Sequence, residues 1–263
     1  MSPTPEFYHR DPNRASLLDL ARVFGSAGGQ LAQLLYPLAW EDFVFEKDDF
    51  VVSTLNSDMW TLAVDGGTTF AIPGTRIVGG AVSGATGVAD NDGLSIRLNS
   101  AILTGNRGGG MACRFRSDTV SGFQFEIGLT DTLTDFTLPG VTDIDTPAVG
   151  NGSTNLAAVH MDTDQTLTTM SFASYDGTTA AKDDLGTLTP TAATWMTVIV
   201  QMIGTTPICI IDRAQEGSAG FGVLNAGISQ TALMLPYAYF RTRNTTTKNI
   251  DIDYIAFWQE RDA

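Results

Sequence analysis

The stretch FQFEIGL, residues 123–129, alternates apolar and polar side chains without interruption. Its apolar members are Phe123, Phe125, Ile127 and Leu129, and the others are Gln124, Glu126 and Gly128. Successive side chains of a β-strand point to opposite faces, so this period of two predicts an antiparallel strand with one face in a core and the other in solvent. We therefore interpret Glu126 as an outward-facing charge.

Similar short segments recur from about Asp48 to the end of the chain, separated by turn-forming residues. They are FVVSTL (50–55), MWTLAV (59–64), GTRIVGGAVSG (74–84), LSIRL (94–98), MACRFR (111–116), LAAVHM (156–161), LTTMSFASY (167–175), WMTVIVQMI (195–203), ICIID (208–212), PYAYFRTR (236–243) and IDIDYIAFW (250–258). Only the tract 130–155, rich in Asp, Thr, Gly and Pro, is interpreted as a broad loop. This pattern predicts an all-β fold, a two-sheet antiparallel β-sandwich over residues 47–263.

The charge of the chain excludes several classes of partner. Its formal net charge is −14, with 15 basic and 29 acidic residues. Binding to nucleic acid or to an anionic membrane surface needs clustered Lys and Arg, so we expect neither partner. No apolar run reaches the roughly 18 residues that a membrane helix needs, and the start shows no secretory signal. We expect synthesis in the cytoplasm.

The first 46 residues differ from the rest and are predicted to form a short, partly helical N-terminal arm. Ser16 is a suitable N-cap for LLDLARVF, and a second apolar segment, residues 30–40, is interrupted by Pro37. Two such short helices cannot bury their apolar faces alone, so they must pack on the following domain or on another chain. The residues expected to bind a partner are Leu17, Leu20, Phe24, Leu31, Leu34, Leu35 and Trp40.

The stretch KNIDIDYIAFW, residues 248–258, raises the question of catalysis. Asp251 and Asp253 would lie on one face of a strand about 6.7 Å apart, a spacing that suits the two carboxyl groups of a retaining glycosidase. The run resembles the E-x-D-x-E strand of concanavalin A-like β-glucanases, but Asn249 stands where the nucleophile would be. An amide cannot form the glycosyl ester, so we interpret the strand as structural and expect no catalytic residue.

Other catalytic arrangements find little support. The chain has two histidines, His9 and His160, and no G-x-S-x-G motif. His160 lies in an apolar segment and is interpreted as a core residue rather than a base. Cys113 and Cys209 are interpreted as buried thiols, with a disulfide between strands as the alternative. The sequence therefore predicts a protein that is not an enzyme.

No cofactor or metal ligand is assigned, although calcium stays open as an alternative. Three clusters offer carboxylates to a hard cation: DNDG (90–93), TDID (142–145) and MDTD (161–164). None has the spacing of an EF-hand loop, and such clusters are typical of turns.

Three motifs carry a broader resemblance. They are GFQFEIGLTD (122–131), the segment from Trp195 to Asp212, and the terminal IDIDYIAFWQER (250–261). Together they resemble concanavalin A-like (laminin G-like) jelly-roll domains of tailed-bacteriophage virion proteins. The resemblance implies a non-enzymatic virion structural protein, a capsid decoration or cement protein that docks on capsid or other virion proteins through its arm. It also implies a symmetric homo-oligomer, with a trimer favoured.

Two alternatives remain. The first is a carbohydrate-binding fibre or spike module that holds a surface glycan on exposed aromatic side chains. The available aromatics are Trp60, Trp195, Trp258, Tyr237 and Tyr239. The second is a β-glucanase-like glycoside hydrolase, which the amide of Asn249 disfavours.

Overall fold

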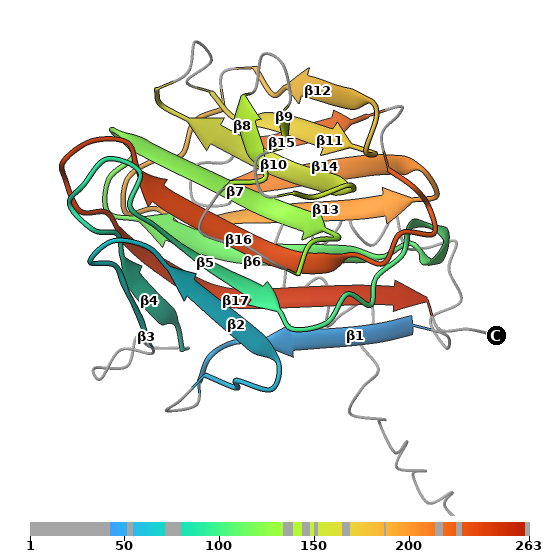
Figure 1. The fold of residues 1–263 in the computed structure, drawn as a ribbon, viewed down its shortest axis with the longest axis horizontal. Helices are drawn as coiled ribbons and strands as arrows, with labels where there is room; N and C mark the ends of the chain where they lie inside the picture. The colour runs from blue at the N-terminus through green and yellow to red at the C-terminus, as the bar shows by residue number, and fades with distance from the viewer. Residues whose placement is uncertain are drawn as a thin grey trace, which may run out of the picture.

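The fold was described from a computed structural model and consists of two stacked antiparallel sheets, shown in Figure 1. The structure describes residues 43–51, 55–71, 80–133, 139–143, 148–149, 152–164, 169–186, 188–213, 218–224 and 228–260. The predicted all-β sandwich is therefore confirmed. The arm residues assigned to a partner, Leu17 to Trp40, lie outside the described residues. No helix among the residues just listed is long and apolar enough to cross a membrane.

Sheet A, the eight-stranded sheet, forms one layer of the sandwich. In order across the sheet its strands are β15 (Ser218–Val223), β14 (Thr206–Arg213), β13 (Met196–Ile203), β6 (Gly110–Ser117), β17 (Asn249–Glu260), β4 (Val82–Ala85) and β3 (Thr69–Ala71), and β1 (Phe43–Asp48) also pairs with β17. Strand β1 takes in residues 43–46, which the sequence placed at the end of the arm. The sequence analysis predicted none of the strands β1, β3 and β15.

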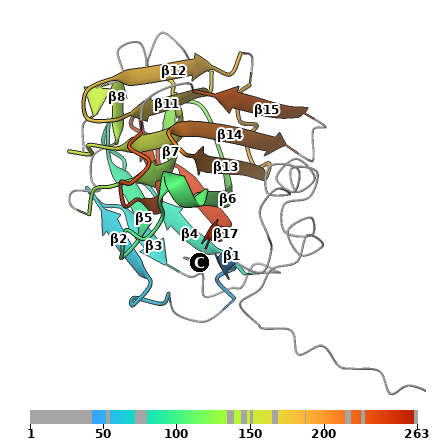
Figure 2. The same cartoon turned by 90° about the vertical axis from the view of Figure 1, so that its right-hand side faces the viewer.

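Sheet B, the seven-stranded sheet, forms the other layer. Its strands in order are β12 (Ala180–Asp184), β11 (Ser171–Tyr175), β10 (Leu156–Asp162), β7 (Phe123–Thr130), β16 (Leu235–Thr242), β5 (Gly93–Leu98) and β2 (Trp60–Val64). Figure 2 shows the same two layers in a view turned by 90° from that of Figure 1. A short 3₁₀ helix, η2 (Gly105–Arg107), precedes β6.

The core lies between the sheets and is built from the apolar side chains of alternating positions. Phe115 of β6 contacts Phe125 and Phe240 of sheet B, with ring centroids 5.1 Å and 5.2 Å apart. A second aromatic group joins Phe50, Trp60 and Phe257 near the edge of the sandwich. Phe50 has a positive φ of 51° and is not part of a strand, so the strand predicted from residue 50 was wrong at its start.

Strand β7 is the central strand that opened the sequence analysis, and its outer face is not in solvent. All eight of its residues are buried, including Gln124 and Glu126. A small hairpin, β8 (Val141–Asp143) with β9 (Ala148–Val149), forms within the tract predicted to be a loop. Backbone N–H groups of Gly140 and Val141 contact Glu126, so this segment lies over β7. Glu126 faces away from the core as predicted, but the prediction that this face of the strand lies in solvent was wrong for that reason.

Strand β17 has 12 residues and pairs with three other strands. Its residues pair with β6 along one edge, while β4 and β1 share the other edge one after the other. The register with β6 shifts between Ile252 and Tyr254, which makes Asp253 a bulge residue. A β-bulge re-aims the side chains that flank it. The simple two-residue spacing assumed for Asp251 and Asp253 therefore does not hold.

Candidate ligand-binding site

A pocket of about 310 Å³ opens at one end of the sandwich. Its lining residues are Asn56, Asp58, Met59, Leu98, Asn99, Ser100, Ile102 and Phe257. They come from the turn before β2, the segment after β5 and one position of β17. The pocket thus collects residues from three distant parts of the chain.

Hydrogen bonds join the turn before β2 to the segment after β5. The side-chain amide of Asn99 donates to the carbonyl of Ser57 at 2.8 Å, and its backbone N–H donates to the carbonyl of Met59 at 2.8 Å. The side-chain oxygen of Asn56 accepts the backbone N–H of Asp58 at 3.0 Å, an Asx turn. These bonds fix the positions of the residues at the rim of the pocket.

The lining combines an apolar floor with a polar rim. Phe257 is 4% exposed and Leu98 is 5% exposed, while Ile102 is 38% exposed. The rim supplies the carboxylate of Asp58 and the hydroxyl of Ser100, together with amide groups. Ligand pockets commonly pair a mostly apolar surface with a few polar groups that set orientation. Among the described lining residues the one charged side chain is the carboxylate of Asp58.

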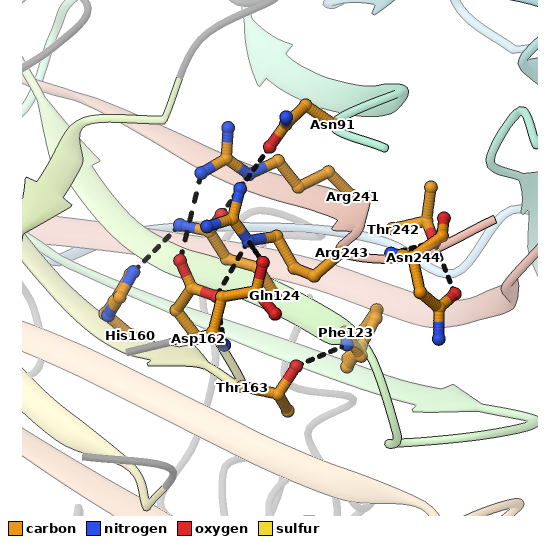
Figure 3. Close-up of polar contacts among 11 residues, drawn as sticks. Asn91, Phe123, Gln124, His160, Asp162, Thr163, Arg241, Thr242, Arg243 and Asn244 are labelled. Carbon is orange, nitrogen blue, oxygen red and sulfur yellow. Dashed lines mark hydrogen bonds and ion pairs between the residues drawn. The ribbon is translucent and has the colours of Figure 1, made fainter. Parts of the chain in front are cut away.

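A second polar group of side chains lies on the outer face of sheet B, shown in Figure 3. Asp162 of β10 pairs with Arg243 at 2.9 Å (Oδ1 to Nε) and with Arg241 at 3.8 Å (Oδ2 to Nη2). Arg241 also donates to the oxygen of Gln124, and Gln124 donates to Nε2 of His160 at 2.9 Å. This network joins β7, β10 and β16, the three central strands of the sheet.

The same network shows why His160 is not a base. The ring is 1% exposed, and burial lowers its pKa to about 3, with Arg241 and Arg243 acting in the same direction. The imidazole is therefore neutral at physiological pH. It is buried as predicted, although on the outer face of the sheet rather than between the sheets. The network residues Gln124 and Asp162 are likewise 0% and 1% exposed, which leaves little surface for a ligand.

Glu126 of β7 is another polar residue that is buried on the outer face of sheet B. Its carboxylate accepts hydrogen bonds from the backbone N–H groups of Gly140 (2.9 Å) and Val141 (2.7 Å) and from the hydroxyl of Tyr237. Burial raises the pKa of Glu126, while these hydrogen bonds act in the opposite direction. Since these hydrogen bonds join β7 to Gly140 and Val141, we assign Glu126 the role of fastening the start of β8 to sheet B.

The two aspartates of the glycosidase hypothesis lie on the outer face of sheet A. Asp253 pairs with Arg114 at 2.6 Å and Asp251 with Arg116 at 2.8 Å, and Ser83 donates to Asp251 at 2.5 Å. The two guanidinium groups also lie over the ring of Trp195, at 5.1 Å and 4.6 Å. The arginine partners could not be found from the sequence, because the pairing of β6 with β17 is a property of the sheet.

We expect both ion pairs to contribute little to stability. Their side chains are 18–35% exposed, and ion pairs in such positions are typically worth less than about 1 kcal/mol. Asp251→Asn and Asp253→Asn should each lower the free energy of unfolding by about 1 kcal/mol or less, measured by urea titration. A loss above about 3 kcal/mol would instead mark a buried, strongly coupled pair.

Most of the aromatic side chains proposed to stack on a sugar are buried. Of the five aromatics proposed for sugar stacking, only Trp195 is partly exposed. The other four are at most 2% exposed: Trp60, Trp258, Tyr237 and Tyr239.

Both cysteines are free and buried, as predicted, and burial raises their pKa values.

Some of the aspartates in the clusters proposed for calcium form ion pairs or hydrogen bonds within the protein. Asp162 and Asp164 pair with Arg243, and Asp92 accepts the backbone N–H of Ala89. The side chains of the cluster at 142–145 lie outside the described residues. Within the described ranges no group of three or more His, Cys, Asp and Glu side chains could hold a metal ion.

Comparison with known proteins identifies the fold. No protein-family model and no curated protein matches the chain. Among solved structures, a winged bean acidic lectin in complex with methyl-α-D-galactose has a TM-score of 0.54 at 10% identity, covering 84% of this chain and 100% of the lectin. A protein of unknown function from Shewanella oneidensis MR-1 also has a TM-score of 0.54, at 12% identity, covering 83% of this chain and 87% of that one.

A further similar structure is of phage origin. The CBM2 module of the evolved Dit of Lactobacillus casei BL23 phage J-1 has a TM-score of 0.51 at 13% identity, covering 83% of this chain and 96% of the module. At such identities the likeness shows the fold alone, which is the lectin-like jelly roll that the sequence resemblance implied.

Proposed function

We propose that this protein is a non-enzymatic carbohydrate-binding module whose saccharide site is the pocket between the 56–59 turn, the 98–102 segment and Phe257. The observation that carries the proposal is the composition of this pocket. A sugar ring presents hydroxyl groups along its edge and C–H groups on its faces. The rim of Asp58, Asn56 and Ser100 can bind the former, and the floor of Met59, Leu98 and Phe257 can cover the latter.

Size and fold support the same proposal. The volume of about 310 Å³ is at the lower end of the range for ligand pockets, which suits one sugar ring or the end of a chain. Two of the similar structures are a lectin with a bound galactoside and a module named for carbohydrate binding. The sequence had placed this function second, behind capsid decoration, and the pocket now favours it.

Loss of the Asp58 carboxylate is the direct test of the site. A carboxylate that accepts hydrogen bonds from a ligand contributes about 1.5–3 kcal/mol, so Asp58→Ala should weaken binding of the saccharide at least about tenfold. A glycan array would identify the saccharide, and calorimetry of wild type and variant would give the affinities.

A matched control is available at the other end of the same strand. Asp65 follows β2 as Asp58 precedes it, and it is exposed and absent from the pocket lining. Asp65→Ala removes the same charge and should leave the affinity unchanged. Equal effects of the two variants, or an array on which no glycan binds, would contradict the proposed site.

A second proposal concerns where such a module acts. We propose that the protein is carried on a bacteriophage particle, as a capsid decoration protein or as part of a tail fibre or spike. The similarity to the phage Dit module supports this setting, together with the virion-protein motifs in the sequence. Mass spectrometry of the purified particles should find hundreds of copies for a head decoration or a few for a tail component. Absence of the chain from the particles would contradict the proposal.

A further inference from the structure

The carboxylate of Asp48, the last residue of β1, accepts hydrogen bonds at both of its oxygens. Oδ1 accepts the backbone N–H of Phe50 at 2.9 Å, and Oδ2 accepts the indole N–H of Trp60 at 2.8 Å. Strand β1 belongs to sheet A, whereas Trp60 begins β2 of sheet B, and both strands lie at the same edge of the sandwich (Figure 1). One carboxylate therefore joins the two sheets at the start of β2.

The first of these hydrogen bonds sets the conformation of the chain at Phe50. This residue has a φ of 51°, a left-handed conformation that bulky side chains seldom adopt. An aspartate that accepts the N–H two residues further on forms an Asx turn, which stabilises a local reversal of the backbone. The turn places the ring of Phe50 beside that of Trp60, with centroids 6.3 Å apart.

Trp60 connects Asp48 to the pocket in two ways. Its ring meets the ring of Phe257 edge-on, with centroids 6.5 Å apart and an angle of 81° between the planes. Its backbone N–H donates to the carbonyl of Asn56 at 2.9 Å. Phe257 and Asn56 both line the pocket, so the position of Trp60 governs both the floor and one side of the rim.

Any effect of Asp48 on a ligand passes through these neighbours. Among the described residues that line the pocket, neither Asp48 nor Trp60 appears. A hydrogen bond to an ionised acceptor is stronger than one between neutral groups, so it holds the indole in one orientation. A site that is already ordered loses less conformational freedom when its ligand binds, and it binds more tightly for that reason.

We propose that Asp48 is a positioning residue of the pocket: its carboxylate fixes the indole of Trp60, which in turn holds Phe257 and the 56–59 turn in the arrangement that receives a sugar. This inference rests on the proposed saccharide site. It adds that the affinity of the site is set in part by a carboxylate of sheet A that lies outside the pocket. Asp58 binds the ligand directly, whereas Asp48 acts through Trp60.

Asp48→Asn tests the carboxylate with the least change of shape. An amide has one oxygen where the carboxylate has two, so one of the two N–H donors loses its acceptor. By calorimetry, the saccharide that binds most tightly on the glycan array should bind about tenfold more weakly to this variant, as expected for loss of a hydrogen bond to a charged group. Asp49→Asn is the matched control, because that side chain is 46% exposed and pairs with Lys47. It should leave the affinity unchanged.

A double-mutant cycle shows whether the effect passes through Trp60. Trp60→Phe keeps an aromatic ring but removes the indole N–H that Asp48 accepts. It should weaken binding by a similar factor, and the double variant should bind no more weakly than either single variant, to within about twofold. Trp60→Phe also carries the test if Asp48→Asn does not fold, which circular dichroism of each variant will show.

The possible results separate this inference from the saccharide site itself. If Asp58→Ala weakens binding and Asp48→Asn does not, the site stands and Asp48 has no positioning role. A lower free energy of unfolding with unchanged affinity would limit Asp48 to stability, and effects that multiply in the double variant would show that Asp48 does not act through Trp60. If no saccharide binds to the wild type, both proposals are wrong.

Discussion

Replacing Phe115 by alanine is expected to lower the free energy of unfolding by about 3–5 kcal/mol, the usual cost of removing a fully buried aromatic side chain. Phe115 is 1% exposed and is the side chain of sheet A that contacts both Phe125 and Phe240 of sheet B. Its loss removes apolar contact area and leaves a cavity in the middle of the sandwich. Urea unfolding followed by circular dichroism would measure the difference.

Two further variants separate packing from a general effect of mutation. Phe115→Leu keeps much of the apolar volume and should cost clearly less than Phe115→Ala. Ile203→Ala removes an apolar side chain that is 47% exposed at the end of β13, and should cost less than about 1 kcal/mol. If Phe115→Ala cost no more than Ile203→Ala, the contact between the two sheets described above would be wrong.

The second large effect is expected at Asp162, in the network on the outer face of sheet B. Asp162→Asn keeps the shape of the side chain but removes the negative charge that faces Arg241 and Arg243. The side chain of Asp162 is fully buried and those of the two arginines are 11% and 16% exposed. Breaking a buried ion pair from one side typically costs about 3–5 kcal/mol, because the remaining charge stays buried without its partner.

Asp164 provides the matched control for this prediction. It pairs with the same guanidinium of Arg243, at 3.3 Å, but its side chain is 43% exposed. Asp164→Asn should therefore cost about 1 kcal/mol or less, since solvent screens an exposed pair. Chemical denaturation of both variants at neutral pH makes the comparison. Similar losses for the two would mean that burial does not set the strength of this network.

The proposed saccharide site places one demand on the molecule. A pocket that binds a sugar must be open to solvent, and its rim residues Asp58 and Ser100 are both exposed.

The positions of most strands could be predicted because each strand carries its own period of two. The segments 94–98, 111–116 and 195–203 are strands in the structure almost to the residue. The pairs of hydrogen-bonding residues could not be predicted, because pairing depends on which strands become neighbours. The ion pairs of Asp251 and Asp253 with β6 follow from that order alone.

The pocket was missed for a similar reason. Asn56, Asn99 and Phe257 are far apart in the sequence, and each looks like an ordinary turn or strand residue. Their common property is a place at the same end of the sandwich. The aromatics that the sequence did nominate turned out to be mostly buried, since a large aromatic side chain in a strand usually packs in the interior.

The sequence by itself determined that this chain forms an all-β sandwich. Alternation of apolar and polar residues is a local property, so each strand segment shows it without knowledge of its neighbours in the sheet. Only the tertiary structure decided which faces are covered. Glu126 points away from the core, as its position in the alternation requires, yet it is buried under the segment that begins β8. Alternation tells which side a residue faces, whereas burial depends on a second segment that returns over that side from elsewhere in the chain.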